Sequence, residues 1–244
     1  MAPPIRAVWA VPRSVSTAFE RMVAERGDLE VLSEPFSVAY YDGPEARSSR
    51  YPCTAPEATF AAVRRRVLEA GTTAAVFCKD MAYHVLPALD DALMRACHHT
   101  VLIRDPAWSL PSLAAQWPDF TTDEAGFAAA HALHDRLREA GCDVVVLDAA
   151  DLCRDPEEMV AQWCARAGLP VRPESLRWSS GMRPEWTRWQ EWHATTAAST
   201  GFLAAPEPPP VSSDRRMRDA ITAARAHYGA LAAHALRPKE RCAP

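Results

Sequence analysis

The sequence predicts an α/β fold of three layers, in which a central parallel sheet of about five strands lies between helices. Three observations indicate this fold class. Short apolar runs of strand type alternate with longer helical patterns, as they do in βαβ units. Most of these runs are apolar on both faces, which is typical of strands that helices cover on both sides. The composition, with 48% hydrophobic and 24% charged residues, is that of a globular chain able to bury a large core.

The expected strands are the five apolar runs, at residues 5–11, 29–33, 73–78, 99–103 and 143–147. The expected helices lie between and after them, at residues 16–26, 56–70, 84–96, 106–116, 123–140, 155–168 and about 214–235. Right-handed crossovers place such helices on the two faces of the sheet. Residues 37–55 carry Gly, Pro and several tyrosines without a clear period, so we expect a long loop beside the substrate. Residues 204–213 are Pro-rich and are expected to be extended and mobile.

Length, charge and cysteine content limit the class of protein. No shift in composition divides the chain, so we expect residues 1–244 to form a single domain. The net charge of −4 indicates neither nucleic acid nor an anionic membrane surface as a partner, and no stretch is apolar enough to span a membrane. The seven cysteines include no C-x-x-C pair, so neither a disulfide framework nor a zinc site is indicated. We expect a cytoplasmic protein with reduced cysteines; the sequence carries no sign of its oligomeric state.

The first chemical motif is the turn PRSVST at residues 12–17, between the first expected strand and the first expected helix. Helix N-termini gather at the carboxyl edge of a parallel sheet, where their free N–H groups favour an anion. Ser14, Ser16 and Thr17 add hydroxyl donors, and Arg13 adds a permanent positive charge. A capped helix start with a surface arginine explains the same residues equally well. The turn lacks the glycines and the lysine of a Walker A loop, which disfavours hydrolysis of ATP or GTP.

The second motif follows the fourth expected strand. Arg104 ends that strand, Asp105-Pro106 begins a helix, and Ser112 lies two turns further along on roughly the same face as the helix start. A second anion could bind between Arg104 and Ser112. A helix start beside a surface arginine is the simpler interpretation of this motif taken by itself.

Together the two motifs resemble the sulfotransferases that use 3′-phosphoadenosine 5′-phosphosulfate (PAPS). In that family a strand-loop-helix segment P-[RK]-S-x-[ST]-T binds the 5′-phosphosulfate, and a segment R-[DN]-P-x5-S binds the 3′-phosphate. Residues 12–17 and 104–112 match them in the same order and at strand ends. The resemblance implies a P-loop-like fold, PAPS as the sulfonate donor, release of 3′-phosphoadenosine 5′-phosphate (PAP), and no metal. The donor-binding residues that it implies are Arg13, Ser14, Val15, Ser16, Thr17, Arg104 and Ser112.

Two positions of the first motif differ from many members of that family. Val15 stands where many have glycine, and valine resists the positive φ that glycine tolerates. Arg13 stands where many cytosolic members have lysine, as it does in the tyrosylprotein branch. The resemblance implies that Arg13 stabilises charge on the departing phosphate.

The resemblance also requires a base that takes the proton of the acceptor. Glu34, 21 positions after Arg13, is close to where the tyrosylprotein branch carries its glutamate, but it could instead be a loop carboxylate paired with an arginine. His84 is the other candidate. It is displaced by three residues from the histidine of the K-T-H motif of cytosolic members, and a structural histidine is the simpler interpretation. Lys79 could reach the sulfonate or a base, or could lie on the surface at a strand end.

Residues 177–202 form an unusually aromatic stretch with tryptophans at positions 178, 186, 189 and 192. The spacing of the last three predicts one buried face of a helix, while one of the four could stack on an adenine or an aromatic acceptor. Ser199 and Thr200 resemble a stretch that follows the tryptophans in related bacterial sequences. The resemblance implies that they contact the nucleotide, although a polar loop is the simpler interpretation.

These motifs predict a PAPS-dependent sulfotransferase that moves a sulfonate group to a hydroxyl, amine or N-hydroxyl group of a small molecule, in specialised metabolism. The main alternative is a non-catalytic protein that binds PAP or another nucleotide and has lost a competent base. A kinase with an atypical loop is a third alternative, which would need ATP and Mg²⁺. The missing loop lysine disfavours it.

Overall fold

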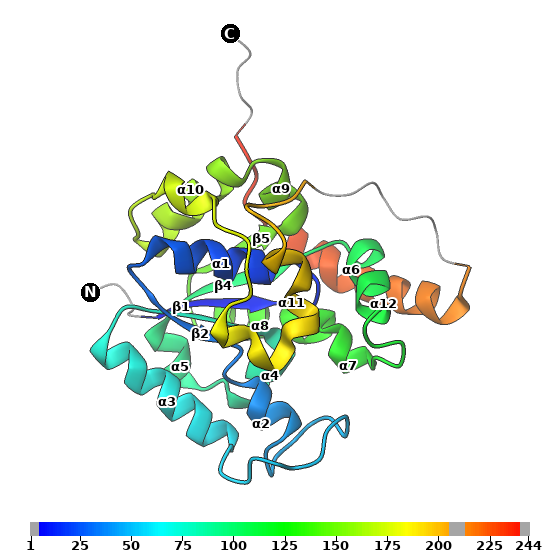
Figure 1. Ribbon diagram of the computed structural model, residues 1–244. Coiled ribbons are helices and arrows are strands. Elements are labelled where there is room, and N and C mark those ends of the chain that lie inside the picture. The colour runs from blue at the N-terminus through cyan, green and yellow to red at the C-terminus, as the bar shows by residue number, and fades with distance from the viewer. Residues whose placement is uncertain (1–4, 205–212, 240–244) are drawn as a thin grey trace.

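The computed structural model, which describes residues 5–204 and 213–239, is built around one parallel β-sheet (Figure 1). Its strands are β1 (Ile5–Ala10), β2 (Glu30–Ser33), β3 (Val76–Met81), β4 (Cys97–Ile103) and β5 (Val144–Asp148). The order in the sheet is β2-β3-β1-β4-β5, and every neighbouring pair is parallel. The expected α/β fold with a five-stranded parallel sheet is confirmed.

Helices fill the connections between the strands. The α-helices are α1 (Ser16–Arg26), α2 (Ser37–Tyr41), α3 (Phe60–Thr73), α4 (Ala82–Val85), α5 (Asp91–Ala96), α6 (Pro106–Ala114), α7 (Thr122–Ala125), α8 (Phe127–Glu139), α9 (Ala149–Arg154), α10 (Pro156–Ala167), α11 (Gln190–Ala197) and α12 (Arg215–Ala232). The 3-10 helices of the described ranges are η1 (Leu86–Ala88), η2 (Pro173–Leu176) and η3 (Pro184–Trp189). Within the described ranges, no helix combines the length and apolar character that a membrane span needs.

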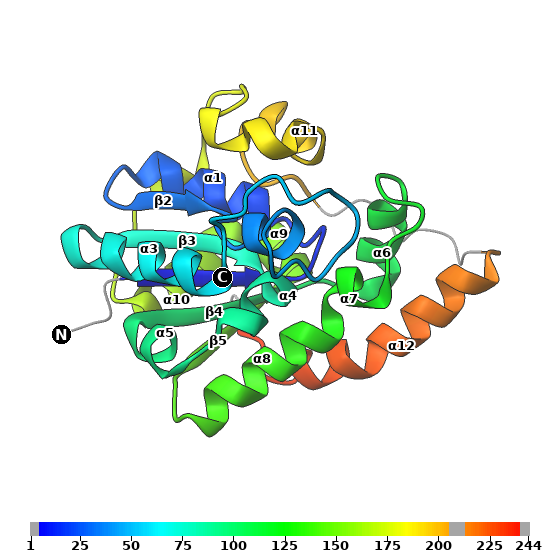
Figure 2. The same cartoon turned by 90° about the horizontal axis from the view of Figure 1, so that it is seen from below.

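The sheet is covered on both faces, which explains why β1 and β3 are buried along their whole length. In Figure 1, α1 and α10 lie above the sheet, and α3 and α5 lie below it. Phe19 of α1 packs on Phe77 of β3 and on Trp163 of α10, with ring centroids 6.1 Å and 4.9 Å away. The long helix α12 packs along α8 (Figure 2). The result is the three-layer arrangement that the apolar runs predict.

The third strand differs from its prediction in a way that affects the site. It is Val76–Met81 rather than residues 73–78, because α3 continues to Thr73. The polar pair Lys79-Asp80 therefore lies inside the strand, and both side chains are fully buried. From the sequence, a strand buried on both faces is expected to end before its first charged residue, here Lys79.

Two expected helices are divided by residues that interrupt the backbone hydrogen bonds. The helix expected at residues 84–96 is α4, η1 and α5, because Pro87 has no N–H to continue α4 and Asp90 caps a new helix. The helix expected at residues 123–140 is α7 and α8, separated by Gly126 at φ 79°.

Further differences from the prediction concern the loops. The loop expected at residues 37–55 begins with α2, and the unpredicted helix α9 follows β5. The Pro-rich stretch expected at residues 204–213 falls almost entirely outside the described residues. None of these differences changes the order of the strands.

Candidate functional site

A cavity lies at the carboxyl edge of the sheet, where the loop after β1, the end of β3 and the helices α6 and α11 meet. In a parallel sheet this edge also collects helix N-termini, here that of α1. The lining includes the arginines 13 and 104, the histidines 84 and 193, and the aromatic residues Tyr41, Tyr83, Trp117, Trp189, Trp192 and Phe202. The cavity therefore combines cationic, titratable and apolar groups.

The loop after β1 turns sharply enough to place two residues in the left-handed region of backbone space. Arg13 has φ 61°, and Val15, the N-cap residue of α1, has φ 62°. A valine in this region costs about 1–3 kcal/mol, whereas glycine adopts it freely. Ser14 secures the turn, because its hydroxyl donates to the carbonyl oxygen of Val11 at 2.7 Å. The turn after β1 is therefore strained, because the side chain of Val15 disfavours the positive φ that the turn requires.

Two arginines near the start of α1 have only neutral hydrogen-bond partners among the residues that the structure describes. Arg13 donates from Nε to Ser112 Oγ at 2.8 Å and from Nη1 to the carbonyl oxygen of Trp192 at 3.2 Å. Arg104 donates from Nη1 to the carbonyl oxygen of Arg13 at 3.0 Å. Burial and the nearby charge of Arg104 lower the pKa of Arg13, and burial lowers the pKa of Arg104. Within the described part of the chain neither guanidinium is ion-paired with a carboxylate, so both charges are left for an anion.

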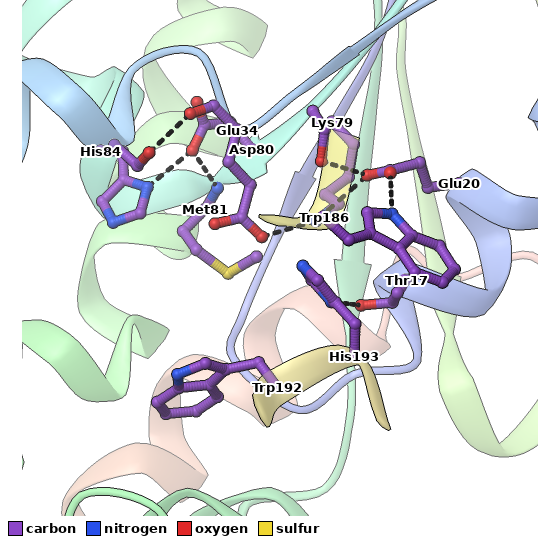
Figure 3. A network of polar contacts seen from close by, with 12 residues as sticks. Thr17, Glu20, Glu34, Lys79, Asp80, Met81, His84, Trp186, Trp192 and His193 are labelled. Atoms are coloured by element: carbon purple, nitrogen blue, oxygen red, sulfur yellow. Dashed lines mark hydrogen bonds and ion pairs between the residues drawn. The ribbon is translucent and has the colours of Figure 1, made fainter. Parts of the chain in front are cut away.

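Behind the cavity lies a buried chain of ion pairs and hydrogen bonds (Figure 3). Lys79 Nζ lies 2.5 Å from Glu34 Oε1 and 3.2 Å from Glu20 Oε2. Glu20, on α1, also accepts from Trp186 Nε1 at 2.6 Å and from Ser33 Oγ at 2.9 Å. Burial opposes the charge of Glu34, but Lys79 and the nearby histidines together hold the pKa of Glu34 below its ordinary value. Burial likewise opposes the charge of Lys79, and the two glutamates raise the pKa of Lys79.

Asp80, the next residue of β3, holds His84 in one orientation (Figure 3). Its carboxylate accepts from the backbone N–H of Phe36 at 2.6 Å and of Met81 at 2.8 Å, and Oδ1 lies 2.6 Å from His84 Nδ1. Burial raises the pKa of Asp80, while His84 acts in the opposite direction. Because two backbone donors already favour the ionised carboxylate, the third bond is donated by Nδ1–H of His84. Nε2 of His84 is buried and has no partner among the described residues.

Helix α11 brings a second histidine to the cavity. His193 is 2% exposed, and its Nδ1 lies 3.0 Å from Thr17 Oγ1. Burial and the charge of Lys79 lower the pKa of His193 to about 4, so the ring is neutral near pH 7. Its Nε2 has no hydrogen-bond partner within the described ranges. The two imidazole rings therefore differ in what holds them: a carboxylate holds His84, and a hydroxyl holds His193.

Aromatic rings form much of the remaining wall. The ring of Tyr41 lies 5.8 Å from that of Trp189 and 5.9 Å from that of Trp117, measured between centroids. Trp117 packs on Trp192 at 4.6 Å, and the hydroxyls of Tyr41 and Tyr83 are 3.0 Å apart. Burial raises the pKa of both tyrosines far above neutral pH, so neither supplies a tyrosinate. The wall offers ring edges and faces to an apolar group.

The structure brings most of the residues singled out from the sequence to this cavity. Those that line it are Arg13, Val15, Ser16, Thr17, Glu34, His84, Arg104 and Ser199. The others lie beside it: Ser14 and Lys79 are fully buried, and Ser112 bonds to Arg13. Thr200 is exposed, and its carbonyl oxygen accepts from the backbone N–H of Trp178. Lys79 forms an ion pair with a base candidate, Glu34, and does not lie on the surface at a strand end.

Asp80 and His193 are among the residues in and behind the cavity that the sequence does not single out. Asp80 carries a usable signal, because an adjacent lysine and aspartate at the end of an apolar run need partners if the strand continues. His193 carries no local signal. Its position depends on Thr17, which is 176 positions away in the chain.

The chain matches a family model and curated proteins. The model, described as a sulfotransferase domain, matches residues 5–235. The branched-chain-amino-acid aminotransferase-like protein 2 of Arabidopsis thaliana is 31% identical over 204 residues, which cover 80% of this chain and 35% of that protein. The aminotransferase-like protein 1 of the same plant is 29% identical and is covered over 36% of its length. The chain thus spans about a third of the length of the curated relatives it matches.

Solved structures share the fold at low identity. The sulfotransferase domain of the olefin synthase of Synechococcus PCC 7002 has a TM-score of 0.55 at 16% identity, covering 91% of this chain and 94% of that one. The sulfotransferase STF9 of Mycobacterium avium has a TM-score of 0.50 at 14% identity, covering 93% of this chain and 76% of that one.

Proposed function

Since this chain belongs to the sulfotransferase domain family, we propose that it transfers a sulfonate group from PAPS to a hydroxyl, amine or N-hydroxyl group of a small molecule. One observation carries the proposal. Arg13 and Arg104, both partly buried, have only neutral hydrogen-bond partners among the described residues, and the same cavity contains an imidazole nitrogen, Nε2 of His84, that has no partner among them. An anionic donor would neutralise the arginines, and a base would stand beside it.

The residues around the loop after β1 fit such a donor. Arg13 and the first N–H groups of α1 would hold the reacting phosphosulfate, because a helix N-terminus and a guanidinium both favour an anion. Arg104 and Ser112 would hold the second phosphate. Ser112 is bonded to the side chain of Arg13, and Arg104 is bonded to the backbone carbonyl oxygen of Arg13. When bound, PAPS supplies an activated sulfonate. The part of Arg13 is to stabilise the charge that develops on the departing phosphate.

His84 suits the role of base better than Glu34 does. Lys79 lowers the pKa of Glu34, and a weakly basic carboxylate committed to an ion pair gains little by taking a proton. The Nδ1–H of His84 is fixed on Asp80, which leaves the lone pair of Nε2 to accept the acceptor's proton. Asp80 would then stabilise the imidazolium that forms. In this proposal Lys79 is a positioning residue, because its ion pair holds the carboxylate of Glu34 in place beside the cavity.

The apolar wall is the part of the cavity that supports a small-molecule acceptor. Trp117, Trp189 and Tyr41 can pack on a flat or branched apolar group. The chemical identity of the acceptor would come from a screen that follows the donor test.

We also propose a cytoplasmic location, which the free cysteines among the described residues support.

The first test is calorimetric titration of the whole chain with PAP, ADP and 5′-AMP, with and without Mg²⁺. We expect PAP to bind without metal and to lose affinity when the 3′-phosphate is absent. The Arg104→Ala variant should bind PAP about as weakly as the wild type binds ADP. Equal affinity for PAP and ADP in the wild type would contradict the proposal, and binding that requires Mg²⁺ and prefers ATP would favour a kinase.

A second candidate function is a non-catalytic protein that binds PAP. The strained Val15, which many sulfotransferases replace by glycine, favours it. The alternative predicts PAP binding without turnover of PAPS by any acceptor. A screen of phenols, alcohols and amines with PAPS, following release of PAP, distinguishes the two functions.

A further inference from the structure

His193 is fixed at the end of the cavity where the arginines lie. Its Nδ1 contacts Thr17, in the first turn of α1, and its neighbour Trp192 accepts a hydrogen bond from Arg13 through its carbonyl oxygen. Figure 3 shows the ring of His193 between Thr17 and the carboxylate of Glu34. Two successive residues of α11 thus contact the loop that would hold the reacting anion.

The unpartnered Nε2 of His193 points to a ligand. A buried polar atom without a partner costs free energy, and most buried polar atoms in proteins are hydrogen-bonded. Here the atom belongs to a side chain that lines the cavity and is 98% buried, and no described residue satisfies it. A bound group in the cavity would satisfy it.

The surroundings select the protonation state that would act on such a group. The ring is neutral near pH 7, so it carries one N–H. The Thr17 hydroxyl can donate to Nδ1, which leaves the proton on Nε2. Nε2–H is then a neutral donor that has no partner among the described residues and is available to a group bound in the cavity.

The geometry points to His193 as a further catalytic residue, which donates from Nε2–H to an oxygen of the sulfonate during transfer. This inference rests on the proposed function. The transferred group must lie between the anion site at Arg13 and Thr17 and the base at His84, and His193 contacts Thr17 on that side. A neutral, fixed donor stabilises an anionic oxygen without taking a proton from the acceptor. His193 would therefore bind a part of PAPS that PAP lacks.

The test compares two variants that each keep one edge of the imidazole. In His193→Asn the amide can replace Nδ1 and keep the contact with Thr17, but it does not reach the position of Nε2. In His193→Gln the amide reaches the position of Nε2. Affinities of the whole chain for PAPS and for PAP are measured by calorimetry at pH 7 without an acceptor. The ratio of the two affinities isolates contacts to the sulfonate.

We expect His193→Asn to bind PAP like the wild type and to lose about 10- to 100-fold in affinity for PAPS, the range for a hydrogen bond to a charged group. His193→Gln should restore most of the affinity for PAPS. Equal weakening of PAP and PAPS in His193→Asn would overturn the inference and assign His193 to the packing of α11. An unchanged ratio in both variants would overturn it as well. Failure of the wild type to bind PAP would instead contradict the proposed function.

Discussion

Replacing Asp80 by asparagine should separate the two base candidates. The carboxylate now accepts from Phe36 N–H, Met81 N–H and His84 Nδ1–H, at 2.6, 2.8 and 2.6 Å. An amide has one oxygen and one NH2 group, so in either orientation one backbone N–H loses its acceptor. His84 also loses the negative charge that would stabilise its protonated form. The change is nearly isosteric, so its effects come from hydrogen bonding and charge.

Two magnitudes follow from that geometry. One unsatisfied buried N–H should lower the free energy of unfolding by about 1–3 kcal/mol. General base catalysis contributes about 10²–10⁴-fold, so kcat for sulfonate transfer should fall within that range. Affinity for PAP should stay unchanged, because the hydrogen-bond partners of Asp80 are Phe36, Met81 and His84, and the proposal assigns none of them to the donor.

The assay measures initial rates of PAP release from PAPS with a series of phenols of graded acidity, together with urea unfolding. The loss in kcat should shrink for the most acidic phenols, which need the least help from a base. Asp90→Asn is the matched control, because Asp90 also accepts a backbone N–H, from Leu93, but caps a helix outside the cavity. A folded Asp80→Asn variant with kcat near that of the wild type would refute the reasoning. The reasoning would also be refuted if the whole loss of kcat were observed in a Glu34→Gln variant instead.

Three further outcomes follow from the structure. Lys79→Met should lower the free energy of unfolding by about 3–5 kcal/mol, because it leaves two carboxylates in the protein interior without their cation; urea unfolding at pH 7 measures this, and a change below 1 kcal/mol would contradict it. Arg50→Ala should lower the free energy of unfolding by about 3 kcal/mol, since Arg50 pairs with Glu124, whose side chain is 1% exposed. Arg95 pairs with Asp91 on the surface, and a loss no larger than that of Arg95→Ala would contradict this prediction. The pKa of His193 falls from 6.5 to about 4 on folding, so the unfolded chain binds the additional proton between these values and stability falls as pH drops through them. Between pH 7 and pH 4 the free energy of unfolding of His193→Gln should therefore fall by about 3 kcal/mol less than that of the wild type. An equal fall in the two proteins would be inconsistent with the lowered pKa of His193.

The sequence predicts the sheet well because its signals are local. The apolar runs at residues 5–11 and 143–147 match β1 and β5 to within a residue at each end, since a strand covered on both faces must be apolar throughout. The end of β3 was missed for a physical reason. Lys79 can be buried there only because Glu20 and Glu34 meet it from other segments, and such pairing is not visible in the run itself.

The candidate site divides in the same way. The loop at residues 12–17 and the segment from Arg104 are local motifs, and the structure places both at one cavity. The composition reveals the aromatic stretch after residue 177, but it does not reveal that helix α11 of this stretch packs on α1. His193 acquires its partner through the packing of α11 on α1, and no spacing in the sequence encodes that contact.

The hydrogen bond from Arg13 to the carbonyl oxygen of Trp192 has a consequence for engineering the protein. The segment that would shape the acceptor pocket, through Trp189 and Trp192, is anchored to the same arginine that would grip the donor. Substitutions that enlarge or reshape this wall are expected to shift α11 and so to change the affinity for the proposed nucleotide. A library selected for new acceptors should therefore be scored for PAP affinity as well, because the two properties will vary together.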